Sequence, residues 1–261
     1  MDRQEAVLRE LNLYPLWVPR TVEQEVPDVA LPAVVAADAV VPAQNAENGA
    51  TEVVRIDPPL IEHHENIQHE QASAIEGLGW AALKNRVRDC TACKLREGCT
   101  QTVFGVGDEQ ADWLFVGEGP GADEDAQGEP FVGQAGKLLD NMLAAIKLKR
   151  GKNVYIANVV KCRPPNNRAP EVDEVASCLP YLHRQIELIQ PKIIVALGKT
   201  AATALLGKDA TLASLRGTLH TYQNILLVVT YHPAYLLRSP SEKAKVWQDL
   251  CMALNNVNLN Y

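Results

Sequence analysis

The amino-acid sequence predicts an α/β fold in which helices cover both faces of a parallel sheet. From residue 81 onward, short apolar runs rich in β-branched residues alternate with segments of helical periodicity, which is typical of parallel sheets. The Gly-rich, acidic residues 117–125 follow the first apolar run and precede a helical segment. Such a turn lies at the carboxyl edge of a sheet, where α/β proteins place their sites, although a solvated acidic loop would have the same composition.

The elements can be assigned in chain order. The first helix leads into Cys90 and Cys93, and Gly207 is a natural stop for the fourth helix. We expect strands at residues 113–117, 153–160, 192–197 and 225–230, and helices at residues 81–88, 135–146, 171–189, 199–206 and 242–254.

The first 80 residues differ in composition from the rest of the chain. They hold 14 acidic and 4 basic side chains, a net charge of −10, whereas residues 81–261 carry a net charge of +3. Residues 21–79 contain no Phe, Trp or Tyr, so they cannot bury enough surface to offset their chain entropy. We therefore expect a short helical peptide at residues 1–20, a disordered acidic linker at residues 21–79 and one folded domain at residues 80–261. The linker histidines are expected to be solvated rather than metal ligands: His63, His64 and His69.

The bulk composition narrows the class of protein. A hydrophobic content of 47% suits a globular domain with a sizeable core. The mixed charge of the first residues argues against a signal peptide, and no apolar run is long enough to span a membrane. We therefore expect a cytoplasmic protein. We also expect a monomer. The overall net charge of −7 does not exclude nucleic acid as a partner, because the folded part is mildly basic.

Six cysteines in a chain of this kind indicate metal or redox chemistry rather than a disulfide framework. Cys90 and Cys93 form one CxxC pair, and fifteen residues separate Cys162 from Cys178. A wide second pair fits an iron–sulfur cluster better than zinc, whose second pair is usually close. Zinc and the absence of any metal are the alternatives. Cys99 competes as a ligand on spacing alone.

Four separated motifs resemble those of the family 4 uracil-DNA glycosylases. The resemblance covers roughly residues 80–252 and implies a three-layer α/β/α sandwich with a four-stranded parallel sheet. It also implies hydrolysis of the N-glycosidic bond of deoxyuridine in DNA, as in base excision repair. The motifs are residues 117–121 (GEGPG), 128–133 (GEPFVG), 158–165 (NVVKCRPP) and 231–237 (YHPAYLL). The ligand set that the resemblance implies for a [4Fe–4S] cluster omits Cys99 and consists of Cys90, Cys93, Cys162 and Cys178.

The resemblance also assigns roles in reading the base. An enzyme that cleaves a base from DNA must first flip the nucleotide out of the stack. Phe131 is the expected platform for the ring, with a place in the core as the alternative. Asn158 is the expected reader of uracil, since one amide can donate to O4 and accept from N3–H. His232 is expected to donate to O2 as charge develops there, with a structural cap as the alternative.

Further positions are expected to contact the DNA or the water. Leu236 would be the apolar wedge that fills the vacated stack, and phosphate contacts are expected from Arg163, Arg168 and Arg238. Backbone groups of Glu118 and Gly119 are expected to contact uracil.

The best-known uracil glycosylases carry a water-orienting Asp at the position of Gly119, so this chain lacks that carboxylate. Glu124 is the candidate for positioning water or for shaping the pocket against the methyl group of thymine. Glu118 and Asp125 are the reserve candidates, and one of these carboxylates is expected to cap a helix. The loop at residues 163–168 contains no His, so covalent trapping of the sugar is not expected.

The N-terminal segment suggests a partner. Residues 2–20 faintly resemble the N-terminal peptide of the psi subunit of the bacterial clamp loader, which implies docking on replication machinery. The alternative is a helix that folds back on its own domain. A rival function for the whole chain is a non-catalytic replisome adaptor that keeps a glycosylase-like fold.

Overall fold

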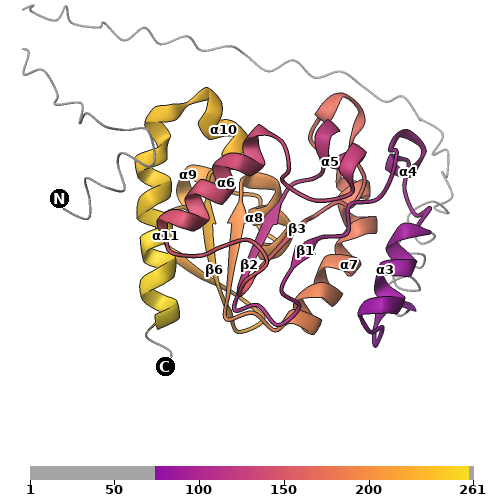
Figure 1. Cartoon of the computed structure of the whole chain (residues 1–261), viewed down its shortest axis with the longest axis horizontal. Helices are drawn as coiled ribbons and strands as arrows, with labels where there is room; N and C mark the ends of the chain where they lie inside the picture. Colours follow the sequence, from indigo (N-terminus) through magenta and orange to yellow (C-terminus); the bar gives the residue numbers. More distant parts are fainter. Residues whose placement is uncertain (1–73, 259–261) are drawn as a thin grey trace, which may run out of the picture.

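A mixed sheet of six strands forms the centre of the computed structural model, which describes residues 74–258 (Figure 1). Its four central strands run parallel, and one antiparallel strand is added at each edge. Across the sheet, the order is β1 (Val106–Gly107), β3 (Val154–Asn158), β2 (Trp113–Gly117), β4 (Ile193–Leu197), β6 (Ile225–Thr230) and β5 (Leu219–Tyr222).

The central strands are covered on both faces. Every residue of β2, β3 and β4 is buried, as expected for near-continuous apolar runs in a parallel sheet. Side chains of a strand alternate between the two faces. Leu114 and Val116 therefore belong to one core cluster, whereas Trp113 and Phe115 belong to the other.

Helices supply the outer layers. Residues of α3, α7 and α8 contribute to the first cluster, and residues of α6 and α11 contribute to the second. Figure 1 accordingly shows α3 and α11 on opposite sides of the strands. The helices are α3 (Trp80–Arg88), α4 (Leu95–Gly98), α5 (Ala122–Gln127), α6 (Gln134–Ala145), α7 (Val172–Ile189), α8 (Lys199–Leu206), α9 (Leu212–Leu215), α10 (Pro233–Arg238) and α11 (Lys243–Asn258), with 3-10 turns η1 (Pro165–Asn167) and η2 (Pro240–Glu242).

The predicted α/β class is confirmed, and so are the predicted strands and helices, with ends that shift by a few residues. The predicted strand count is wrong, because the short strands β1 and β5 extend the sheet to six. The acidic residues after β2 form the helix α5 rather than an open loop. The Glu124 side chain caps this helix by accepting from the backbone N–H of Gly121 (3.1 Å).

Residues 1–73 and 259–261 lie outside the described part of the chain. The predicted peptide at residues 1–20 and the three linker histidines therefore fall outside it, as does most of the predicted linker. Ile75 belongs to the predicted linker but lies within the described residues. It is 3% exposed and packs in the first core cluster. Among residues 74–258, no helix is long and apolar enough to cross a membrane.

Candidate active site

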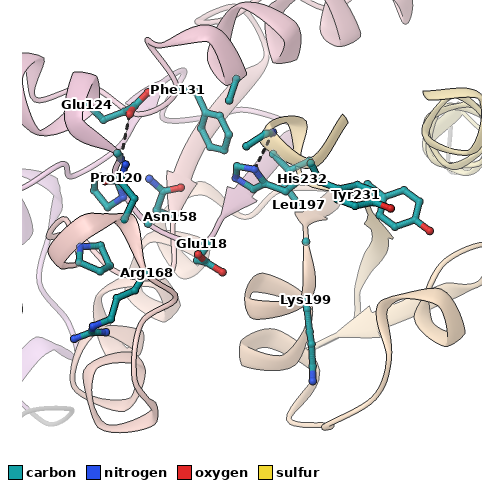
Figure 2. Close-up of a pocket in the computed structure, with 18 of the residues that line it drawn as sticks. Glu118, Pro120, Glu124, Phe131, Asn158, Arg168, Leu197, Lys199, Tyr231 and His232 are labelled. Carbon is teal, nitrogen blue, oxygen red and sulfur yellow. Dashed lines mark hydrogen bonds between the residues drawn. The ribbon is translucent and has the colours of Figure 1, made fainter. Parts of the chain in front are cut away.

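A cavity of about 650 Å³ opens at the carboxyl edge of the parallel strands (Figure 2). Its walls come from the residues that follow β2, β3, β4 and β6, which lie side by side although they are distant in sequence. Figure 2 shows the side chains of Asn158, Phe131 and His232 converging on one space. The structure thus brings together the three side chains that the sequence assigned to uracil.

Asn158 ends β3 and is 2% exposed. Its Oδ1 has no hydrogen-bond partner among the described residues, which is costly for a buried acceptor unless a ligand completes it. Its backbone carbonyl accepts from Lys161 Nζ at 2.8 Å, and Lys161 Nζ also donates to Gln185 Oε1 at 2.6 Å. Gly117, its neighbour on β2, leaves the amide room, since a Cβ there would overlap Asn158 Oδ1.

Phe131 faces the same space, with its ring centroid 5.4 Å from that of His232 and an interplanar angle of 31°. Its backbone has a φ of 57°, which is unusual for a residue other than glycine and is often found at functional sites. Arg150 holds this conformation by donating to the carbonyls of Pro130 (2.8 Å) and Phe131 (2.7 Å). Gly136 allows the loop to approach, because a Cβ there would overlap the Phe131 carbonyl.

His232 caps the N-terminus of α10. Its Nδ1 accepts from the backbone N–H of Ala234 at 3.2 Å, so the neutral ring carries its proton on Nε2. Burial and the nearby charge of Arg238 lower the pKa of His232 to about 4, against a smaller opposing effect of Glu124. The imidazole is therefore neutral at physiological pH and presents an N–H donor. The predicted cap and the predicted donor are compatible, since they use different nitrogens.

The three candidate carboxylates occupy different environments. Glu124 lines the cavity, but its Oε1 accepts from the backbone N–H groups of Val132 (2.8 Å) and Gly133 (3.0 Å) and its Oε2 caps α5. Asp125 is 4% exposed and accepts from the backbone N–H of Thr100 at 2.8 Å, away from the cavity wall.

Glu118 also lines the cavity. Its Oε2 accepts a hydrogen bond from Thr200 Oγ1 on α8, and its backbone carbonyl accepts from Val160 N at 3.1 Å. The neighbouring Gly119 lines the cavity too, and a Cβ there would lie 2.7 Å from Val160 Cγ2. The backbone carbonyl of Glu118 is thus already hydrogen-bonded within the protein. Of the three carboxylates, the Glu118 side chain is the one best placed to contact a ligand.

The residues predicted to contact DNA are spread around the cavity. Arg168 and Arg238 line it, whereas Arg163 instead donates from Nε to Asn167 Oδ1 at 2.8 Å. Arg168 is paired with Glu174, whose side chain is 1% exposed, at 2.7 Å. Leu236 does not fit its predicted role as a wedge. It is 1% exposed, because the turn of α10 directs it into the second core cluster.

The predicted cluster ligands surround one small space beside α3 and α7. The backbone N–H of Lys161 donates to one of their sulfurs at 3.2 Å, and that of Ala92 donates to another at 3.5 Å. Cys99 does not line this space, although its thiol contacts that of Cys162 and contributes, after burial, to raising the pKa of Cys162. The Cys99 Sγ also donates to the Arg96 carbonyl at 3.7 Å. The cysteines that line the space are Cys90, Cys93, Cys162 and Cys178.

Burial raises the pKa of the Cys178 thiol to about 12, so thiolates here require a positive centre. In residues 74–258 no three His, Cys, Asp or Glu side chains are placed to hold a single metal ion. A [4Fe–4S] cluster bound by four cysteines needs wider spacing, because each thiolate binds a different iron atom. The four cysteines fit such a group in chemistry and in placement around one space.

Several supporting residues were not predicted from the sequence. Arg150, Thr200 and Lys161 each hold a cavity residue through a hydrogen bond. Thr200 lies on a different element from its partner, and Arg150 and Lys161 bond backbone carbonyls. Hydrogen bonds of these kinds have no fixed spacing in the sequence, so no motif indicates them. Only the position of Lys161 offered a signal, because it lies between an apolar run and Cys162, and a charged residue in such a segment needs a partner.

The fold and the cavity together define a class of protein. An amide with a free acceptor, an aromatic ring and a neutral imidazole donor meet at the carboxyl ends of parallel strands. This arrangement suits an α/β protein that binds a planar, hydrogen-bonding ring.

Comparison with known proteins identifies the family. The model of the Uracil DNA glycosylase superfamily matches residues 104–251. The chain is 44% identical over 175 residues to the type-4 uracil-DNA glycosylase of Archaeoglobus fulgidus, across 64% of this chain and 87% of the archaeal protein. It is 45% identical over 165 residues to the type-4 enzyme of Thermotoga maritima, across 62% and 85% of the two chains. The chain belongs to the uracil DNA glycosylase superfamily, and its relatives place it in the type-4 branch.

Proposed function

We propose that this protein is a DNA repair enzyme that hydrolyses the N-glycosidic bond of deoxyuridine in DNA, releasing uracil and leaving an abasic site. The observation that carries the proposal is the unpartnered, buried Oδ1 of Asn158, in the space shared with Phe131 and His232. The names of the type-4 relatives state this activity. The alternative of a non-catalytic adaptor finds no support among them.

The Asn158 amide discriminates between bases by its polarity. Its Oδ1 accepts from N3–H of uracil, while its Nδ2 donates to O4. Cytosine presents an acceptor at N3 and a donor at N4, so it would leave the buried amide unsatisfied at both positions. The ring of Phe131 stacks on the flipped base and fixes its plane.

His232 stabilises the leaving group. As the bond from C1′ to N1 breaks, uracil takes up negative charge that reaches O2. The Nε2–H of the neutral imidazole donates to this oxygen, and the bond strengthens as the charge develops. Because the pKa of His232 is lowered to about 4, the ring serves as a hydrogen-bond donor and not as an acid that transfers its proton at neutral pH.

A water molecule must attack C1′ of the oxocarbenium-like sugar. We assign its positioning to the Glu118 carboxylate, which Thr200 Oγ1 orients on the cavity wall. Glu124 instead fits the second of its two predicted roles, that of shaping the pocket, because backbone amides already occupy both of its oxygens. The proton released by the water passes to Glu118 or to solvent.

The DNA contacts are assigned from position. Arg238 is exposed at the rim of the cavity. Arg163 and Arg168 lie half-buried in the loop after β3, where they already bond Asn167 and Glu174, and all three arginines are assigned to phosphates. We reassign the role of apolar wedge from the buried Leu236 to Leu237, which is 47% exposed on the same helix.

The [4Fe–4S] cluster is part of the proposal. Cys90, Cys93, Cys162 and Cys178 would hold it, and it would tie the segment after α3, the segment after β3 and α7 to one centre. No step of the reaction passes through it. Cytoplasmic location and a monomeric state stay predictions, as does the docking of residues 1–20 on a clamp loader. A pull-down that recovers clamp-loader subunits equally with the full chain and with a chain lacking residues 1–20 would end the docking idea.

The test of the function is release of free uracil from an oligonucleotide with one deoxyuridine. We expect the wild type to release it and Asn158→Ala to lose at least a hundredfold in rate, because recognition and orientation both depend on the amide. Asn256→Ala is a control, since Asn256 lies on α11 outside the cavity wall. Wild-type activity in Asn158→Ala, with its thermal unfolding unchanged, would disprove the role of the amide.

A further inference from the structure

One face of α10 presents an aromatic ring and a cation to the mouth of the cavity. Tyr235 and Arg238 are three residues apart, so they lie on the same side of the helix. Both are exposed and both line the cavity. Leu236, between them in sequence, is buried on the opposite side. The helix therefore displays two groups that suit a nucleotide: a stacking surface and a phosphate-binding charge.

The ring of Tyr235 packs against a chain of side chains that hold one another in place. Its centroid lies 4.9 Å from that of Tyr231 with an interplanar angle of 33°. The guanidinium of Arg216 lies 4.4 Å from the centroid of Tyr231 and is itself held by Asp249 at 2.7 Å. Asp249 also accepts from Thr230 Oγ1 at 2.6 Å. A platform that is already ordered loses little side-chain entropy when a ligand binds.

This exposed aromatic pair is distinct from the pair that receives the flipped base. Phe131, 6% exposed, forms the inner pair with His232, whereas Tyr235 is 36% exposed. Tyr231 directly follows β6 and directs its ring away from Asn158 (Figure 2). A ring stacked on Tyr235 would therefore belong to a different nucleotide from the one read by Asn158.

We propose that Tyr235 and Arg238 form a second nucleotide subsite. When the deoxyuridine leaves the base stack, one face of the neighbouring base loses its stacking partner. Tyr235 covers that face, and Arg238 pairs with the phosphate between the two nucleotides. The subsite accepts any of the four bases, because stacking on an aromatic ring uses the π-face alone. This inference rests on the proposed function and names a further contact of the same site.

The test uses a set of short single-stranded oligonucleotides with one deoxyuridine each. One has natural bases on both sides, and two others carry a tetrahydrofuran abasic residue at the 5′ or the 3′ neighbour. KM and kcat for uracil release are measured for the wild type, Tyr235→Ala and Tyr235→Phe. Leu219→Ala is the matched control, because Leu219 is 40% exposed but lies on β5 outside the cavity wall.

We expect loss of one neighbouring base to raise KM of the wild type on the order of tenfold, the usual size of one stacking contact. Tyr235→Ala should show the raised KM on the natural oligonucleotide and no further rise on the abasic one. Tyr235→Phe and Leu219→Ala should behave as the wild type. If Tyr235→Ala responds to the missing base as strongly as the wild type does, the subsite is wrong.

A binding measurement separates this inference from the catalytic proposal. The same oligonucleotides are made with 2′-fluorodeoxyuridine, in which the electron-withdrawing fluorine suppresses cleavage, and their Kd values are measured by fluorescence anisotropy. If the wild type releases no uracil, the catalytic proposal fails, and the Kd values still decide the subsite by the same comparison. Equal Kd values for the natural and abasic forms in the wild type would overturn it.

Discussion

At the scale of single residues, the imidazole of His232 links the site to pH. In the folded state its pKa is lowered to about 4, mainly by burial, whereas an unfolded histidine takes up its proton near pH 6.5. Between these values the unfolded state binds more protons, so acid favours unfolding. The stabilising contribution is complete above about pH 6.5 and is lost as the pH falls towards 4.

The variant His232→Asn tests this linkage. Asparagine keeps an acceptor for the N–H of Ala234 and so preserves the cap, but it does not titrate. We expect the wild type to lose about 1–2 kcal/mol more unfolding free energy than the variant between pH 7 and pH 5. Urea unfolding at the two pH values measures the difference. Parallel loss in both proteins would show that His232 is not held neutral.

Among single residues, sequence reasoning reached those with unusual side-chain chemistry at strand ends. The roles of Asn158 and His232 followed from the resemblance of their motifs to a known family. For Asn158, a polar group that ends an apolar strand also needs a reason to be there. Leu236 and Leu237 could not be told apart, since the choice depends on the turn of a six-residue helix. Arg150 could not be found either, because its partners are backbone carbonyls nineteen and twenty residues away.

At the scale of elements, Glu124 holds the loop that carries Phe131. Its carboxylate connects the start of α5 to the backbone amides that precede α6. We expect Glu124→Ala to lose about 2 kcal/mol of unfolding free energy, because three amides lose a charged acceptor. KM for DNA should rise, while the pH profile of kcat keeps its shape.

Glu118→Gln is the companion variant. It keeps an acceptor for Thr200 but weakens the polarisation of water, so kcat should fall at least tenfold with little change in thermal unfolding. Steady-state kinetics and differential scanning fluorimetry on both variants separate the two roles. The assignment is reversed if Glu124→Ala proves stable but slow while Glu118→Gln keeps full activity.

A buried ion pair attaches α11 to the sheet. Asp249 is 2% exposed, lies 2.7 Å from Arg216 and accepts from Thr230 at the end of β6. Asp249→Ala would leave a nearly buried guanidinium unpaired, and we expect a loss of about 3 kcal/mol by chemical denaturation. The exposed pair of Lys84 and Glu109 is the control, since Glu109→Ala should cost less than roughly 1 kcal/mol. A small loss at Asp249 would show that water reaches the pair.

The elements missed in the sequence are the short ones. β1 has two residues, and β5 lacks the alternation of apolar and polar residues, so neither carries a periodic signal. The helix α5 was read as a loop because its acidic sequence shows no apolar face; a cap and a first turn of carboxylates hold it instead. Long, buried strands and amphipathic helices, such as β4 and α7, carry their pattern in the sequence itself.

At the scale of the whole molecule, the proposed cluster and the uracil pocket share one segment. Asn158 ends β3, Lys161 Nζ holds its carbonyl, and the next residue is the proposed ligand Cys162. The backbone N–H of Lys161 also donates to Cys178 Sγ at 3.2 Å. We therefore expect a change in the position of these sulfurs to move Asn158, the proposed reader of uracil, through the short segment that joins them.

Removal of the cluster should consequently weaken both stability and activity. We expect the purified wild type to contain about four iron atoms and to absorb visible light. Cys162→Ser should lose iron and unfold at a lower temperature, because its loop loses a bond to the centre. It should also release uracil more slowly even below its unfolding temperature, since Asn158 is no longer fixed.

Cys99→Ser should keep the iron, the unfolding temperature and the activity, because Cys99 lies outside the wall around the ligands. Iron content, the visible spectrum and thermal unfolding test the ligand set without any assay of the reaction. Full iron content in Cys162→Ser, or its loss in Cys99→Ser, would show that a different set of thiols holds the centre.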